Sequence, residues 1–206
     1  MTKVLITGFS RFPGAPVNPS GPLALRLAAT RRLPGMPVTA LVLPTTWQAA
    51  SGFPALLERL APDVVLMIGL ASRRRQVSIE LSGRNATGLS PDAGRSRPKS
   101  RRLQAGAPAS RRCTADPAPL LHALRLSGVP AQLSRNAGGY ICNALAFRTY
   151  GWAGAVNPPH LAVFVHIPYP KLGGIPAARM RRGLEALLVA LVAQHRRTRT
   201  IAAARR

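Results

Sequence analysis

The hydrophobic positions of this chain form short runs that predict alternating strands and helices. Continuous apolar runs are typical of strands buried on both faces, and they occur at residues 4–7, 38–43, 63–70 and 161–167. Residues 76–81 alternate between polar and apolar side chains, which predicts a strand with one apolar face. A further strand is expected at 131–134, and the remaining patterns predict helices at 21–32, 47–60, 119–126 and 175–194.

This alternation predicts an α/β fold with a single domain over residues 1–206, in which a largely parallel, twisted sheet has helices on both faces. Sites in such sheets lie beyond the carboxyl ends of the strands. The pattern fails at residues 86–112, where arginine, glycine, serine and proline predict a basic, mobile loop. The basic tail at 196–206 is expected to fray.

Charge changes this picture less than its size suggests. The formal net charge is +23, but only three of the 29 basic residues are lysine, namely Lys3, Lys99 and Lys171. A chain rich in arginine, alanine and proline is typical of a GC-rich coding sequence, so its charge does not by itself indicate a nucleic-acid-binding protein. We expect weak, non-specific binding of polyanions by the arginine-rich surface.

Cysteine content and hydropathy indicate the compartment. Cys113 and Cys142 are too few for a disulfide framework and favour a reducing environment. No apolar run reaches the roughly 18 residues that span a bilayer, and the apolar run after Lys3 is too short for a signal-peptide core. We therefore expect a cytoplasmic protein without a membrane partner.

Cys142 is a candidate nucleophile. It follows the glycine pair Gly138-Gly139 and opens an apolar run, which predicts a tight turn and then a helix with Cys142 in its first turn. Free backbone N–H groups and the helix dipole favour a thiolate at that position. For this stretch alone, a buried structural cysteine is the better supported explanation, because free cysteine is among the most buried residue types.

His166 and Glu80 supply the other groups that a cysteine nucleophile needs. His166 interrupts the apolar run 161–167 at its carboxyl end, and Glu80 lies on the alternating strand in a chain with only six acidic residues. A structural histidine and an ion pair between Glu80 and an arginine are the alternatives. Together the three residues form the minimal Cys–His–carboxylate set for attack on an acyl group.

The sequence resembles the pyroglutamyl peptidase I family, the pyrrolidone-carboxyl peptidases, in several ordered motifs. Thr7 to Gly14 with Asn18-Pro19-Ser20 is similar to the family's TGF-x-x-F-x-G and NPS motifs, and Pro62 to Gly69 is similar to its PD-hydrophobic-G segment. Ala137-Gly138 with Cys142-Asn143 resembles AGT-x-x-CN, and His166-Ile167-Pro168 resembles HIP. Glu80 to Asn85 is similar to ER-x-x-x-N, although Leu81 replaces the arginine.

The resemblance implies a thiol-dependent omega-peptidase that removes an N-terminal pyroglutamyl or related blocked residue from a peptide or small amide, without metal or cofactor. Cys142 would attack the carbonyl, His166 would move the proton and Glu80 would orient His166. Phe9 and Phe12 would sandwich the lactam ring, with Tyr140 and Ile141 in the same pocket. From the sequence alone, the two phenylalanines equally suit a binding mouth or the edge of the core.

One departure from the family concerns the substrate. The family has GQAGGR after its third strand, and here Leu70 stands at the glutamine that helps to recognise the lactam. Gln76 or a backbone group is the candidate to replace that glutamine in recognising the lactam. Two alternatives stay open, an amidase of the same fold with a different cyclic or N-acyl substrate and a non-enzymatic polyanion-binding protein. A homo-oligomer, as in the family, also stays open.

Overall fold

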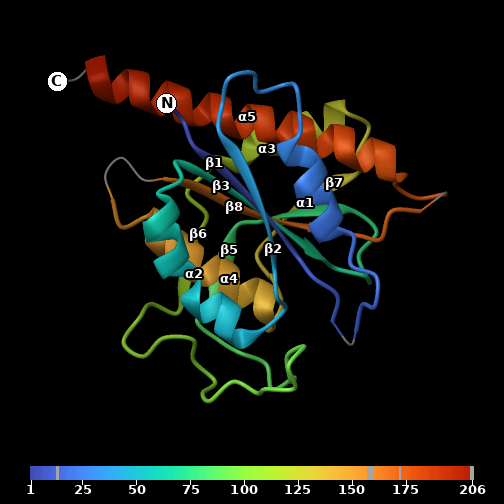
Figure 1. Cartoon of the computed structure of the whole chain (residues 1–206), viewed down its shortest axis with the longest axis vertical. Helices are drawn as coiled ribbons and strands as arrows, with labels where there is room; N and C mark the ends of the chain where they lie inside the picture. The colour runs from blue at the N-terminus through green and yellow to red at the C-terminus, as the bar shows by residue number, and fades with distance from the viewer. Residues whose placement is uncertain (13, 157–159, 172, 205–206) are drawn as a thin grey trace.

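The computed structural model describes residues 1–12, 14–156, 160–171 and 173–204, and the side chains up to residue 200. In chain order, with the labels of Figure 1, the elements are β1 (Val4–Phe9), α1 (Ser20–Ala28), β2 (Val38–Leu43), α2 (Trp47–Leu60), β3 (Val64–Leu70), β4 (Val77–Glu80), β5 (Ser82–Arg84), β6 (Ser110–Arg112), α3 (Pro117–Leu126), β7 (Ala131–Ser134), α4 (Ile141–Ala153), β8 (Leu161–Ile167) and α5 (Ala177–Ala204).

A six-stranded sheet with the order β2-β1-β3-β8-β4-β7 forms the centre of the molecule. The strands β2, β1, β3 and β8 are parallel to one another, and so are β4 and β7. The pair β4 and β7 joins the sheet through an antiparallel pairing of β4 with β8. The predicted α/β class with a largely parallel sheet is confirmed, with this one reversal of direction.

Helices cover both faces of the sheet, and each face has its own hydrophobic cluster (Figure 1). Helices α1, α3 and α5 pack against alternate strand residues such as Val163 and Val165. Helices α2 and α4 pack against the opposite face, which includes Ala162 and Phe164. Both faces of the central strands β1, β3 and β8 are therefore removed from water, which explains their apolar runs, whereas the edge strands β2 and β7 are only partly buried.

The largest differences from the predicted boundaries are in α1, α5 and the loop 86–112, and several other bounds differ by one or two residues. Helix α1 ends at Ala28 rather than residue 32, because a turn follows it. Helix α5 extends to Ala204 instead of ending at residue 194, because residues 195–204 contain neither glycine nor proline and are rich in good helix formers. The last residues of the predicted loop 86–112 form β6, which pairs with β5. None of the helices in the described parts of the chain is long and apolar enough to cross a membrane.

The segment between β5 and β6 has no regular secondary structure, as predicted, but it is tied to the rest of the molecule. The buried carboxylate of Asp92 accepts hydrogen bonds from the N–H groups of Gly94, Ser96 and Trp47, the last at the start of α2. The N–H of Gly88 donates to the carbonyl of Gly139 at 2.5 Å. The segment therefore packs directly on the turn before α4.

Candidate active site

The pairing of β4 with β8 brings Glu80 and His166 together on the face covered by α4. In the antiparallel register Ser78 lies opposite His166 and Glu80 lies opposite Phe164. Val77 and Ile79 belong to the cluster on the other face, so Ser78 and Glu80 point toward α4. Diagonal neighbours on one face of an antiparallel pair are within reach of long side chains, and Glu80 and His166 are such neighbours.

Glu80 Oε1 lies 2.7 Å from Nδ1 of His166, and both side chains are buried. Because an ionised carboxylate can only accept a hydrogen bond, Nδ1 carries the proton and Nε2 is the unprotonated ring nitrogen. The imidazole also lies against the ring of Phe164, with 4.9 Å between the ring centroids. These contacts fix the tautomer and the orientation of His166, as a general base requires.

Arg74 is a further member of this network that the sequence did not reveal. Its guanidinium donates to Oε1 of Glu80 at 2.6 Å and to the backbone carbonyl of Asn136 at 2.7 Å. The same side chain lies 3.4 Å from the hydroxyl of Ser134. Arg74 therefore joins the carboxylate to the segment that leads into Cys142. Glu80 is at once the partner of an arginine and of the histidine.

The pKa of Glu80 is lowered although its side chain is fully buried. Burial by itself would raise the pKa, but the hydrogen bond and the charge of His166 outweigh it, together with contributions from Ser134 and Arg74. Glu80 is therefore ionised at neutral pH and can stabilise an imidazolium on His166.

Cys142 is the second residue of α4, as the sequence predicted. Gly138 has a φ of +84°, a conformation that glycine adopts without strain, and it turns the chain into the helix. The cap residue Tyr140 makes no side-chain capping bond. Because the first hydrogen bond within the helix runs from Ala144 N–H to the Tyr140 carbonyl, the N–H groups before Ala144 have no partner inside the helix.

Gly69 places the thiol beside His166. Gly69 and His166 lie opposite each other in the pairing of β3 with β8. A β-carbon at Gly69 would lie 3.0 Å from Sγ of Cys142 and 2.7 Å from the ring of Phe164. The sulfur therefore packs on the backbone of β3, directly next to the strand position that carries His166.

The electrostatics of Cys142 are not those that its place in a helix predicts. Burial and the negative charge of Glu80 raise the pKa of Cys142 to about 12, and its own backbone N–H and Arg74 oppose this only in part. The resting residue is therefore a thiol. Its ionisation would depend on a base within reach, and His166, which lines the same cavity as Cys142, is the candidate.

Asn143, next to the thiol, fixes the first turn of α4. Its buried amide accepts a hydrogen bond from Arg84 N–H and donates to the carbonyls of Arg84 and Ala86, all within 2.9 Å. Gly83 lies against the helix so closely that a β-carbon there would clash with the backbone of Phe147. Strand β5 thus holds α4 in place, although no pattern in the sequence predicted this packing.

A cavity of about 530 Å³ opens beside Cys142 and His166. Its lining includes four of the five residues that the family resemblance implies for substrate binding: Phe9, Phe12, Leu70 and Tyr140. Its other lining residues come from the turns around it: Asn18, Thr45, Ala71, Arg73, Arg74, Asn136, Ala137 and Gly138. The cavity is the right size for a small ring and lies within reach of a nucleophile and a base.

Aromatic rings form one wall of this cavity. The rings of Phe12 and Tyr140 lie 6.0 Å apart, and the Trp47 ring meets Tyr140 edge-on at 5.6 Å. The hydroxyl of Tyr140 donates to the carbonyl of Pro91 at 3.0 Å, so the irregular segment after β5 supports the wall. The sequence left open whether Phe9 belongs to a binding mouth or to the core. In the structure it lines the cavity and also packs in the core.

Two expected substrate contacts are placed elsewhere. Ile141 is fully buried in the core with Leu5 and Phe9 and is not among the residues that line the cavity. Successive helical residues point about 100° apart, so Ile141 and Cys142 cannot face the same way. Gln76 is exposed and also does not line the cavity, whereas Leu70 does. Arg73 is the exposed polar residue at this side of the cavity.

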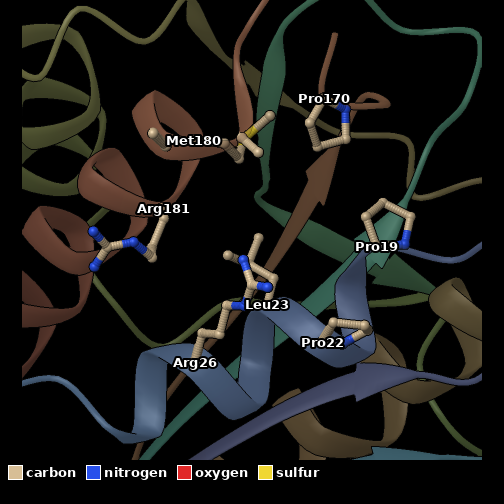
Figure 2. A pocket seen from close by; sticks show the side chains of 9 residues that line it. Pro19, Pro22, Leu23, Arg26, Pro170, Met180 and Arg181 are labelled. Atoms are coloured by element: carbon tan, nitrogen blue, oxygen red, sulfur yellow. The ribbon is translucent and has the colours of Figure 1, made fainter.

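Cys113 lacks the surroundings of a nucleophile. Its thiol lies 3.5 Å from the carbonyl of Ala115, and burial raises its pKa to about 11. A different cavity, of about 420 Å³, lies between α1 and α5 and is lined mainly by apolar residues such as Leu23 and Met180 (Figure 2). The residues that line it include no cysteine, histidine or acidic residue, in contrast to the cavity beside Cys142.

In the described residues, no three His, Cys, Asp or Glu side chains gather as a metal site requires. The groups that the structure brings together are a thiol, an imidazole and a carboxylate. Such a set can attack a carbonyl carbon, hold a covalent acyl group and deliver a proton to a leaving amine.

Comparisons with known proteins identify the relatives of this chain. A model of the pyroglutamyl peptidase family matches residues 2–196. The pyrrolidone-carboxylate peptidase of Gloeobacter violaceus is 35% identical over 199 residues, which cover 92% of this chain and 96% of that protein. That of Streptomyces coelicolor is also 35% identical, over 92% of both chains.

Solved structures agree with the sequence comparison. A mutant pyrrolidone carboxyl peptidase from the hyperthermophile Pyrococcus furiosus matches with a TM-score of 0.83 at 26% identity, over 94% of this chain and 99% of that chain. The enzyme from Thermococcus litoralis matches with a TM-score of 0.82 at 27% identity, over 94% of both chains. These matches confirm the resemblance that the sequence motifs indicated.

Proposed function

This chain belongs to the pyroglutamyl peptidase family, and from that membership we propose that it is a cysteine peptidase that removes an N-terminal pyroglutamyl residue. The observation that carries the proposal is the contact of 2.7 Å between Glu80 and Nδ1 of His166, next to a cysteine at the start of a helix. The cavity beside them, with its aromatic wall, suits a small ring.

In the first half of the reaction, Nε2 of His166 takes the proton of the Cys142 thiol as the sulfur attacks the pyroglutamyl carbonyl carbon. Because burial raises the pKa of Cys142, the thiol depends on this transfer to become a nucleophile. Glu80 stabilises the imidazolium that forms. Backbone N–H groups in the first turn of α4 can hold the negative charge that develops on the carbonyl oxygen.

The second half releases both products. The imidazolium gives its proton to the leaving amine as the carbon–nitrogen bond breaks, which leaves a thioester on Cys142. His166 then takes a proton from water, whose oxygen attacks the thioester carbon. The carbon–sulfur bond breaks, pyroglutamate leaves, and the proton returns from His166 to the sulfur.

The aromatic wall supports the assignment of the ring to this cavity. Phe12 and Tyr140 offer an apolar aromatic surface against which one face of a lactam can pack, and Phe9 lines the same cavity. The N–H and carbonyl of the lactam need polar partners as well. Leu70 offers none, so we expect a reaction that is slower than that of a peptidase with an amide at this position.

A hydrolysis assay tests the proposal. Pyroglutamyl-aminomethylcoumarin should be cleaved by the wild type, whereas N-acetyl-leucyl-aminomethylcoumarin should not. The Cys142→Ser variant should abolish the cleavage. Cleavage of the acetyl-leucyl amide at an equal or higher rate would instead favour an amidase with a different acyl group.

We also propose a cytoplasmic location, which the two free cysteines support. Exposed arginines in the segment after β5, such as Arg95 and Arg101, support weak, non-specific polyanion binding. A homo-oligomer stays an expectation that comes from the family resemblance.

A further inference from the structure

A basic cavity of about 570 Å³ adjoins the catalytic cavity. Its lining includes Arg74, Arg75, Tyr169 and Lys171. Arg74 lines both cavities, so the two spaces meet at the arginine that holds Glu80. The cavity between α1 and α5 in Figure 2 shares no lining residue with the catalytic one.

The basic cavity lies next to the end of β8, the strand that carries His166. Pro168 and Tyr169, which line it, follow His166 almost directly at the end of β8. Arg75 comes from the turn after β3. His166 must reach the leaving amine with its proton, whereas the acyl ring occupies the aromatic end of the catalytic cavity near Phe12. Because Arg74 lines both cavities, the part of a substrate beyond the amine can reach the basic cavity from the catalytic one.

Two of the positive charges that line this cavity, those of Arg75 and Lys171, have no acidic partner in the described part of the chain. Arg75 and Lys171 are exposed, and neither takes part in any ion pair among the described residues. Glu80 is the acid that Arg74 contacts, and its oxygen is already shared with His166. By contrast, Arg181 in the cavity between α1 and α5 is paired with Glu185 at 2.6 Å.

We propose that this basic cavity is a subsite for a carboxylate on the leaving residue of the substrate, with Arg75 and Lys171 as the residues that recognise it. The inference rests on the proposed peptidase activity and adds a substrate class, pyroglutamyl peptides whose second residue carries a negative charge. The carboxylate comes from an acidic side chain or from the free C-terminus of a dipeptide. Both sources present the same two oxygens to the cavity.

Four substrates separate these sources from a general effect of charge. Pyroglutamyl-alanine and its amide differ only in a C-terminal carboxylate, and pyroglutamyl-glutamate amide and pyroglutamyl-glutamine amide differ only in a side-chain carboxylate. For at least one pair, kcat/KM should favour the acid by about three- to tenfold at low salt, since partly exposed charge pairs contribute on this scale. The preference should shrink as NaCl screens it. The pair that shows it identifies the source.

A matched pair of double variants locates the effect. Arg75→Ala with Lys171→Ala should bring the preference for the acid to about one. Lys3→Ala with Arg59→Ala removes the same charge at two exposed residues that line neither the basic nor the catalytic cavity, and should preserve the preference. Lys171→Glu should turn the preference toward the neutral substrate. Circular dichroism verifies that the variants are folded.

Two results would overturn the inference alone, namely equal kcat/KM values for acid and neutral substrates in the wild type, or equal losses of preference in the two double variants. If none of the four peptides is cleaved, the proposed function and this inference fail together. Cleavage of all four with no preference leaves the proposed function intact.

Discussion

Gly69 of β3 lies so close to Cys142 that no side chain fits between them, because a β-carbon at Gly69 would lie 3.0 Å from Sγ. Such a contact is tighter than ordinary van der Waals packing, and the ring of Phe164 blocks the other direction at 2.7 Å. The backbone of the strand thus forms the surface against which the nucleophile rests. The position of the sulfur relative to His166 depends on this close approach.

Gly69→Ala should therefore lower kcat by about 10²-fold, because a shift of roughly 1 Å in a reacting group has that effect. Gly52→Ala is the matched control, since nothing lies within 4 Å of a β-carbon at this exposed position of α2. The control should retain activity and gain about 0.5–1 kcal/mol of stability. Steady-state kinetics and urea unfolding of both variants measure these effects. Full activity in Gly69→Ala would mean that the sulfur does not rest on β3 in the working enzyme.

The two cysteines should differ in function although burial raises the pKa of both. Cys142→Ser should abolish hydrolysis, and Cys113→Ser should leave kcat/KM within about twofold, because Cys113 lies outside the catalytic cavity. Iodoacetamide should inactivate the enzyme through Cys142, faster as the pH rises and more thiolate is present. Mass spectrometry of the labelled peptide identifies the site. An inactive Cys113→Ser variant together with an active Cys142→Ser variant would show that Cys142 is not the nucleophile.

Glu80→Gln should lower kcat by on the order of 10²-fold, because the amide cannot stabilise the imidazolium on His166. It should also change how stability depends on pH. The folded-state pKa of Glu80 lies below its ordinary value of 4.5, so ionised Glu80 stabilises the fold above pH 4.5. That stabilisation is lost as the pH falls through the lowered pKa.

The wild type should therefore exceed Glu80→Gln in free energy of unfolding by more at pH 7 than at pH 3, as urea titrations at both pH values can measure. Glu58→Gln is the control, since Glu58 is exposed and makes no ion pair in the described parts of the chain. A pH-independent difference for Glu80→Gln would contradict an ionised Glu80 in the folded protein.

Leu70→Gln should raise kcat/KM for pyroglutamyl amides by at least several-fold. Leu70 lines the cavity and offers no hydrogen bond, and an unpaired buried polar group costs about 1–3 kcal/mol. The glutamine should not help an apolar N-acyl amide, which has no lactam to recognise. Comparison of the two substrates in wild type and variant measures the effect. If the rate for the lactam does not change, another group such as Arg73 already provides the polar contact.

The strands that position the site could be predicted because each is a short run with a clear pattern. The bounds of β2, β7 and β8 and of helix α2 match the predicted ranges 38–43, 131–134, 161–167 and 47–60. Cys142 and His166 follow from local signals, a glycine turn before a helix and a polar residue at the end of an apolar strand. These signals need no knowledge of distant contacts.

Contacts between distant segments could not be predicted in the same way. Arg74 belongs to a run of three arginines that look alike in the sequence, and only the turn after β3 brings one of them to Glu80 and Asn136. Strand β6 has no apolar pattern and exists because it pairs with β5 and because Arg111 lies 4.4 Å above the ring of Phe147. Ile141 was misplaced because the direction of a helical side chain depends on how the whole helix is docked.

The catalytic groups and the aromatic wall are supported by different parts of the chain. Glu80, His166 and Cys142 depend on the sheet and on α4, whereas Tyr140 is held by a hydrogen bond to Pro91, in a segment without regular structure that Asp92 anchors to α2. Substitutions, insertions or deletions in that segment can therefore reshape the acyl-binding wall while the reacting atoms keep their places. During evolution, an enzyme built in this way can acquire a new acyl specificity without first losing its chemistry.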